Sequence, residues 1–160
     1  MRLVFTKGAG KYDRLDIVTA DGPLAAIDCP KQGIIPHDMV HFAVESEVVT
    51  IGFLGNIAAG GDSGFRAGMD DRHAQSVERL VETVQAEAWG GFHGSGGPVP
   101  FAEFADMYRV TCEARGDPVL ALMPETLAAI RARLSALMAA WAAVAIGGTL
   151  VLDMPAPSSL

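Results

Sequence analysis

The segment RLDIVTADGP, residues 14–23, carries the pattern that decides the fold of this chain. Leu15, Ile17 and Thr19 recur at every second position, which is the period of a β-strand whose two faces lie in different surroundings. Residues 20–23 then combine aspartate, glycine and proline, which are the residue types of a tight turn between antiparallel strands. The segment therefore predicts a strand that ends in a hairpin.

Further short apolar segments extend this hairpin into a sheet. Leu3–Phe5 precede the strand and Leu24–Cys29 follow it, so the N-terminal third of the chain predicts a three-stranded antiparallel meander. Thr149–Asp153 form another apolar segment, after the turn that Gly147 and Gly148 favour. We expect this last strand to return to the same sheet.

The central part of the chain has the features of helices. Pro36 suits the first turn of a helix because its missing N–H needs no partner there. In the segment that follows, Gly52 and Gly55 weaken the helix or permit the close approach of another backbone. Glycines and prolines mark the ends of the later segments. The expected helices cover residues 36–59, 71–89, 101–114 and 124–146.

Together these elements predict an α+β fold. A small antiparallel sheet, made of the N-terminal meander and the C-terminal strand, is expected to pack with about four helices. With 160 residues, the chain is long enough to bury one hydrophobic core. We expect a single globular domain over residues 1–154 and a flexible tail over residues 155–160.

Composition and charge argue against some classes of function. Of the residues, 50% are hydrophobic and 19% are charged, which is typical of a folded chain. The net charge of -7 and the scattered arginines argue against a nucleic-acid partner, because such binding needs basic side chains that neutralise phosphates. Cys29 and Cys112 form no Cys-x-x-Cys motif, and residues 1–12 contain no apolar signal region. We therefore expect reduced thiols in a cytoplasmic protein.

The uncharged stretch from Leu134 to Leu152 has the length of a membrane span. Alanine dominates it, however, so its apolar character is weak. The larger side chains are spaced alternately by three and four residues, which predicts a helix of a soluble protein with one buried face. The same face would suit pairing with a partner helix in a homo-oligomer. Its members are Leu127, Ile130, Leu134, Leu137, Trp141 and Val144.

The segment Pro36-His37-Asp38-Met39-Val40-His41 concentrates the most reactive side chains and reads H-D-x-x-H. In a helix, His37 and His41 stack one turn apart on the same face, where two imidazoles can bind one metal ion. Helical geometry places them at the edge of the apolar face. We expect partial burial there to lower the histidine pKa values and to favour the neutral form, which binds metals.

A third metal ligand has to come from another segment. Glu45 lies two turns from His37, about 12 Å along the helix axis, and is too distant to join both histidines on one ion. An antiparallel hairpin of the helices at 36–59 and 71–89 would place His41 opposite residue 88. The candidate ligands on that arrangement are Glu87 and His93, with Glu82 and Glu78 further along the helix.

Acidic and amide side chains also line one face of the second expected helix. Glu78, Glu82 and Gln85 lie on this face. They form either a solvated surface or a supply of carboxylates for the histidine site.

The H-D-x-x-H segment resembles two known patterns. The zincin proteases carry H-E-x-x-H on a helix, with the glutamate as the general base. Asp38 stands at that position here and is one methylene shorter. The scaffold family of coenzyme Q biosynthesis proteins carries H-D-x-x-H and a distant glutamate, associated with zinc; that glutamate would fall near Phe53 in this chain. Both resemblances imply a divalent ion.

These observations lead to two hypotheses of function. In the first, His37 and His41 bind a divalent metal ion, for which we expect zinc, and Asp38 orients a ligand or acts as a weak base. A bound ion would acidify a water molecule, which favours metal-assisted hydrolysis of a small-molecule substrate. In the second, the histidines are structural and the chain is a non-enzymatic module that binds a partner or forms oligomers.

Overall fold

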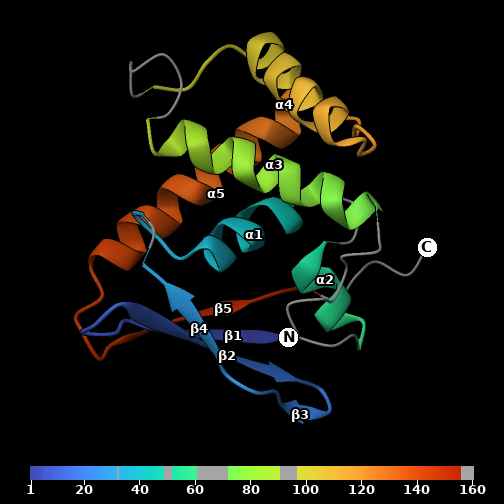
Figure 1. The fold of residues 1–160 in the computed structure, drawn as a ribbon. Coiled ribbons are helices and arrows are strands. Elements are labelled where there is room, and N and C mark those ends of the chain that lie inside the picture. The colour runs from blue at the N-terminus through green and yellow to red at the C-terminus, as the bar shows by residue number, and fades with distance from the viewer. Residues whose placement is uncertain (32, 49–51, 61–71, 91–96, 156–160) are drawn as a thin grey trace.

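An antiparallel sheet forms one layer of the molecule, and the helices stack on one of its faces (Figure 1). The computed structural model describes residues 1–31, 33–48, 52–60, 72–90 and 97–155. Within these residues it contains five strands and five helices, so the predicted α+β fold is confirmed. The elements are β1 (Arg2–Thr6), β2 (Tyr12–Thr19), β3 (Gly22–Pro23), β4 (Ile27–Pro30), α1 (His37–Glu45), α2 (Phe53–Ala58), α3 (Arg72–Ala88), α4 (Phe101–Arg115), α5 (Pro124–Ala142) and β5 (Thr149–Asp153).

The sheet has the strand order β3-β2-β1-β5, and β4 pairs with the first half of β2. β1 is antiparallel to both of its neighbours, and Phe5 lies opposite Leu15 on β2 and Leu150 on β5. The N-terminal hairpin and the return of the C-terminal strand are therefore confirmed. Because side chains alternate between the faces of a strand, Leu15 and Ile17 are both fully buried beneath the helices.

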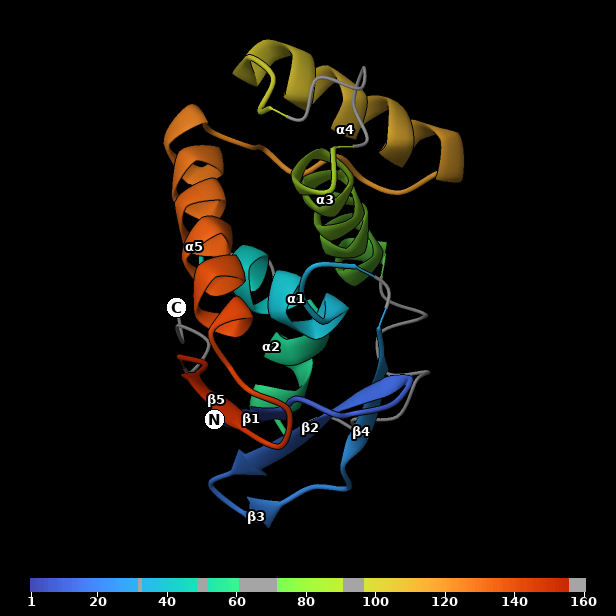
Figure 2. The same ribbon diagram turned by 90° about the vertical axis from the view of Figure 1, so that its left-hand side faces the viewer.

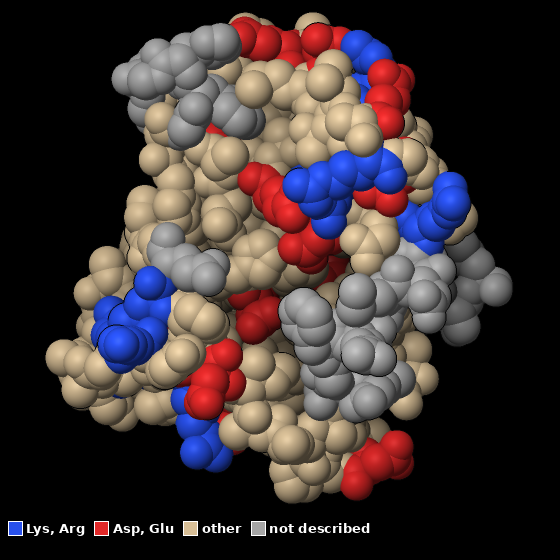
Figure 3. Space-filling view, in the orientation of Figure 1, with Lys and Arg blue, Asp and Glu red and all other residues tan. Residues whose placement is uncertain are grey.

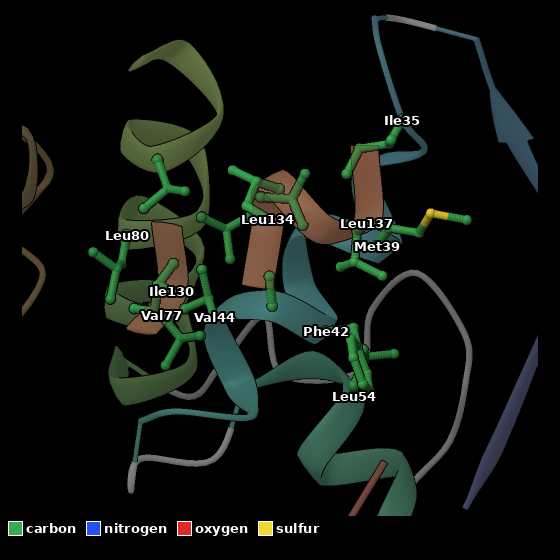
Figure 4. Packing of buried hydrophobic residues seen from close by; sticks show 14 of the residues in the cluster. Ile35, Met39, Phe42, Val44, Leu54, Val77, Leu80, Ile130, Leu134 and Leu137 are labelled. Carbon is green, nitrogen blue, oxygen red and sulfur yellow. The ribbon is translucent and has the colours of Figure 1, made fainter. Parts of the chain in front are cut away.

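Helix α1 lies between the sheet and the longer helices α3 and α5 (Figures 1 and 2). It is enclosed on almost every side, and each of its residues from Met39 to Glu45 is buried. Figure 4 shows Val44 of α1, Val77 of α3 and Ile130 of α5 meeting in this core. α4 packs on α3, on the side away from the sheet (Figure 2). Polar side chains on the buried helix α1 therefore need partners within the protein.

The expected helix over residues 36–59 is interrupted, which corrects the prediction from sequence. α1 ends at Glu45, and α2 begins at Phe53; residues 49–51 lie outside the described part of the chain. Gly52 has extended backbone angles, and a Cβ atom there would lie 2.6 Å from the Glu45 carboxyl carbon. The glycine thus permits the close approach that its position indicated, and the chain turns before α2.

The apolar face of α5 belongs to the core of this chain. Leu127, Ile130 and Leu134 are buried in it, as are the next two members of the predicted face, Leu137 and Trp141. Among the described residues, no helix combines the length and the apolar character that crossing a membrane requires. Residues 156–160, most of the predicted tail, lie outside the described part of the chain.

Replacement of Ile17 by alanine should destabilise the protein strongly. Ile17 is 0% exposed, so Ile17→Ala leaves a cavity against the helices and should lower the free energy of unfolding by about 2–5 kcal/mol. Val18 follows it on the opposite face of β2 and is 38% exposed. Val18→Ala should cost less than about 1 kcal/mol. Urea unfolding of both variants measures the difference, and equal losses would contradict the assigned faces of the sheet.

Candidate metal centre

Helix α1 holds His37 and His41 on one face, one turn apart. Their ring centroids are 4.9 Å apart, and the ring planes meet at 83°. The helix begins directly after Pro36, and the carboxylate of Asp38 lies in its first turn, where it meets the positive end of the helix dipole. The predicted juxtaposition of the two imidazoles is therefore present, and it follows from the i, i+4 spacing alone.

Glu78 of α3 supplies a carboxylate that reaches both histidines. Its Oε1 lies 2.9 Å from Nε2 of His37, and its Oε2 lies 2.6 Å from Nε2 of His41. One ligand atom from each of the three residues can be chosen so that all lie within 4.8 Å of one another. Two imidazole nitrogens and one carboxylate thus converge on one point, which could hold a metal ion.

The opposite ring nitrogens are also held. Nδ1 of His41 donates a hydrogen bond to Oε2 of Glu45 over 2.8 Å. Nδ1 of His37 donates to Oε1 of Gln85 on α3, also over 2.8 Å. Each Nδ1 is therefore occupied, and each Nε2 is directed at Glu78. Metal-binding histidines commonly have this support, because the second hydrogen bond sets the tautomer and the orientation of the ring.

The centre is closed on one side and open on the other. The side chain of His41 is 4% exposed, whereas those of His37 and Glu78 are 34% and 28% exposed. His37 and Glu78 are therefore the two residues of the centre that are partly exposed to solvent. On the face shown in Figure 3, acidic side chains over α3 lie beside basic ones, as the ion pairs of Glu82 with Arg79 and Arg115 require.

The pKa values of the histidines are raised, which corrects the prediction that burial would lower them. Burial does act to lower the pKa of His41, but hydrogen bonds to Glu45 and Glu78 outweigh it and raise this pKa to about 10. The pKa of His37 is also raised, because its hydrogen bonds to Glu78 and Gln85 outweigh burial and the charge of His41. Burial acts to raise the pKa of Glu78, yet its bonds to both rings hold it well below the ordinary range.

Without a metal ion, the centre is therefore an ion-pair network. Both nitrogens of His41 face carboxylate oxygens, so the ring needs both protons to make both hydrogen bonds. Its positive charge lies between Glu45 and Glu78. A metal ion would have to displace the proton on each Nε2, because only an unprotonated nitrogen is a ligand.

The structure does not bring Glu82 or Glu87 to the histidines. Glu87 is buried and forms a bidentate pair with Arg131, with two distances of 2.7 Å. Glu82 lies 3.1 Å from Arg79. His93, the remaining expected ligand, lies outside the described residues.

The register of the helices explains this difference. The expected position of His41 opposite residue 88 requires a continuous helix over residues 36–59. α1 stops at Glu45, and α3 meets the histidines near its middle, at Glu78 and Gln85. Glu78 and Gln85, seven positions apart on one face, both contact His37. The sequence signal for these two partners of His37 was their position on one face of the expected helix over residues 71–89.

Asp38, the expected base, points to a different neighbour. Its Oδ2 accepts a hydrogen bond from the Cys29 thiol over 3.5 Å. Burial and the charge of Asp38 both raise the pKa of that thiol, so Cys29 stays protonated. The proposed role of Asp38 in catalysis remains a prediction.

No family model, curated protein or solved structure matches this chain. The two resemblances of the H-D-x-x-H segment can be compared with the geometry. Where the coenzyme Q scaffold family would place its glutamate, Phe53 packs against His41 with ring centroids 5.9 Å apart. The carboxylate beside the two rings comes instead from Glu78, on a separate helix.

The thermal stability of the metal-free protein should depend on pH through this network. The pKa of His41 is raised from 6.5 to about 10. The stabilisation of the folded protein by the protonated ring is therefore complete below pH 6.5 and is lost as the pH rises towards 10. The pKa of Glu78 is lowered from 4.5, so its stabilisation is complete above pH 4.5 and is lost as the pH falls. We expect the melting temperature, measured with a chelator present, to be highest between these two limits.

Glu78→Gln is the control for this pH profile. A glutamine removes one of the two carboxylates that raise the pKa of His41, while Glu45 remains, so the variant should show a smaller decline in melting temperature above pH 6.5 than the wild type. A wild-type protein whose melting temperature stays constant from pH 6.5 to 10 would contradict the ion-pair network.

Gly52→Ala should disturb the centre through Glu45, because Gly52 packs against the Glu45 carboxylate. A Cβ atom at residue 52 would meet the Glu45 carboxylate at 2.6 Å and a methyl group of Val77 at 2.7 Å. We expect a loss of about 1–3 kcal/mol in the free energy of unfolding, measured with urea. At Gly10, a Cβ atom would find nothing within 4 Å, so Gly10→Ala is the matched control. Equal stability of the two variants would refute the close packing of Gly52 on Glu45.

Proposed function

We propose that this chain binds one divalent metal ion through Nε2 of His37, Nε2 of His41 and the carboxylate of Glu78. One observation carries the proposal: both Nε2 atoms face the two oxygens of Glu78, while both Nδ1 atoms are held by other acceptors. This is the arrangement that preorganised metal centres use to fix their ligands.

The donor set favours a catalytic type of centre over a purely structural one. Structural zinc sites use four protein ligands, whereas catalytic zinc sites use three and leave a position for water. Two histidines and one carboxylate form such a set, which also suits non-haem iron. We propose zinc as the first candidate, because nitrogen and carboxylate ligands suit it. The exposed edges of His37 and Glu78 leave the open position accessible to solvent.

The reaction class that this centre supports best is metal-assisted hydrolysis. A divalent ion lowers the pKa of a bound water towards neutrality and polarises the bond that the water attacks. The buried ring of His41 and the tightly held ring of His37 would keep the ion in one position. The substrate we propose is a small molecule that enters from the open side.

A structural role of the same residues is the second candidate. In the metal-free state each histidine nitrogen already has an acceptor, so the network joins α1 to α3 without an ion. Ion pairs that are buried and fully hydrogen-bonded can serve such a purpose. In this case the chain would be a non-enzymatic module, and its function would lie elsewhere on the surface.

Zinc titration of the purified protein distinguishes these two candidates. We expect one equivalent of zinc to bind in competition with a chromophoric chelator and to raise the melting temperature. His37→Ala and Glu78→Gln each remove a ligand on the open side. Removal of a residue that only supports a metal ligand typically lowers metal affinity roughly 10- to 100-fold. Because each of these two variants removes a ligand itself, each should lose more zinc affinity than that.

Glu82→Gln is the matched control, because Glu82 lies on the same helix but pairs with Arg79. Its zinc affinity should equal that of the wild type. A wild-type protein that binds neither zinc, iron nor manganese, and whose His37→Ala variant melts at a lower temperature, would establish the structural role and refute the metal centre.

A further inference from the structure

Glu45 is an acidic residue enclosed in the protein directly behind His41. Its side chain is 1% exposed. Among the described residues, its charged partner is His41, and no lysine or arginine forms an ion pair with it. Two backbone N–H groups complete its hydrogen bonds: that of Leu54 at 3.2 Å and that of Gly55 at 2.9 Å, both in the first turn of α2. A buried carboxylate is costly unless its neighbours stabilise the charge.

We propose that Glu45 is a positioning residue of the metal centre and that it makes the first turn of α2 part of that centre. The inference rests on the proposed function, because it concerns how the same ion is held. Glu45 binds Nδ1–H of His41 and so keeps Nε2 as the nitrogen that faces Glu78 and the ion. It also makes the imidazole a stronger donor to a metal.

The two histidines differ in their support. His37 is held by the neutral amide of Gln85, which is only partly buried, whereas His41 is held by the buried carboxylate of Glu45. Both contacts measure 2.8 Å, but a hydrogen bond to a charged carboxylate is stronger than one to a neutral amide. The position of the ion should therefore depend more on Glu45 than on Gln85.

The hydrogen bonds of Glu45 connect the ion to α2. The amides of Leu54 and Gly55 hold the carboxylate that in turn accepts the hydrogen bond of His41. Binding of the ion and docking of α2 are consequently linked, and linkage is reciprocal. A bound ion should stabilise the first turn of α2 and slow hydrogen exchange at these two amides.

The test compares Glu45→Gln with Glu47→Gln in the full chain, with zinc alone as the probe. Glu47 lies two residues further along, and its partly exposed carboxylate pairs with Arg133 at 2.7 Å, away from the histidines. We expect Glu45→Gln to weaken zinc binding by about 10- to 100-fold in the chelator competition. Glu47→Gln should bind zinc as tightly as the wild type.

Two further measurements separate positioning from a general loss of stability. In the zinc-loaded wild type, NMR should show His41 protonated at Nδ1, and hydrogen exchange at Leu54 and Gly55 should be slower than without zinc. Gln85→Leu should weaken zinc binding less than Glu45→Gln does. If Glu45→Gln does not fold, the exchange measurement on the wild type decides alone.

The inference and the proposed function fail in different ways. Wild-type protein that binds zinc, together with a folded Glu45→Gln variant of the same affinity, would overturn the role of Glu45 and leave the metal centre intact. Zinc binding without any change of exchange at Leu54 and Gly55 would overturn the link to α2. Wild-type protein that binds no zinc would overturn the metal centre itself and, with it, this inference.

Discussion

The contact between the Glu78 carboxylate and two imidazole rings is the constraint on which the rest of the site depends. It joins α3 to α1 at distances of 2.9 and 2.6 Å. The Glu78 carboxylate can form hydrogen bonds to both rings only if α3 crosses α1 close to Glu78. The position of Gln85 behind His37 follows from the same crossing, whereas Glu45 lies behind His41 because it is four residues further along α1.

The burial of α1 explains why this polar network is so complete. The helix is enclosed by the sheet, α3 and α5, and its apolar side chains Met39, Phe42 and Val44 belong to the core shown in Figure 4. A histidine and a glutamate on such a helix lose their hydration, and the loss is offset only by hydrogen bonds and opposite charges within the protein. His41 and Glu45 supply these to each other, and Glu78 and the amides of α2 supply the rest.

Much of the fold could be predicted because its signals are local. The period of two at Leu15 and Ile17 predicted a strand with one buried face, and the spacing along α5 predicted one buried stripe; both are confirmed. The interruption after Glu45 was not predicted as a break, although Gly52 was noted as a place for close approach. Across the interruption Glu45 accepts hydrogen bonds from the amides of Leu54 and Gly55, and no local pattern records such a contact. The pKa values of the histidines were predicted in the wrong direction because only burial was considered; Glu45 is a local neighbour of His41, whereas the contact of Glu78 with both rings depends on the packing of α3 on α1.

The sequence by itself determined the antiparallel sheet, the three helical segments after residue 70 and the pairing of His37 with His41, since each depends on the spacing of neighbouring residues along one strand or helix. Only the tertiary structure decided which carboxylate meets these rings. Glu78, Glu82 and Glu87 lie on the same helix, and the choice among them depends on where α3 crosses α1. That crossing is set by the packing of the whole core: a shift of α3 by about one turn would bring Glu82 to the place of Glu78, whereas Glu87 lies on the opposite face of α3, against Arg131.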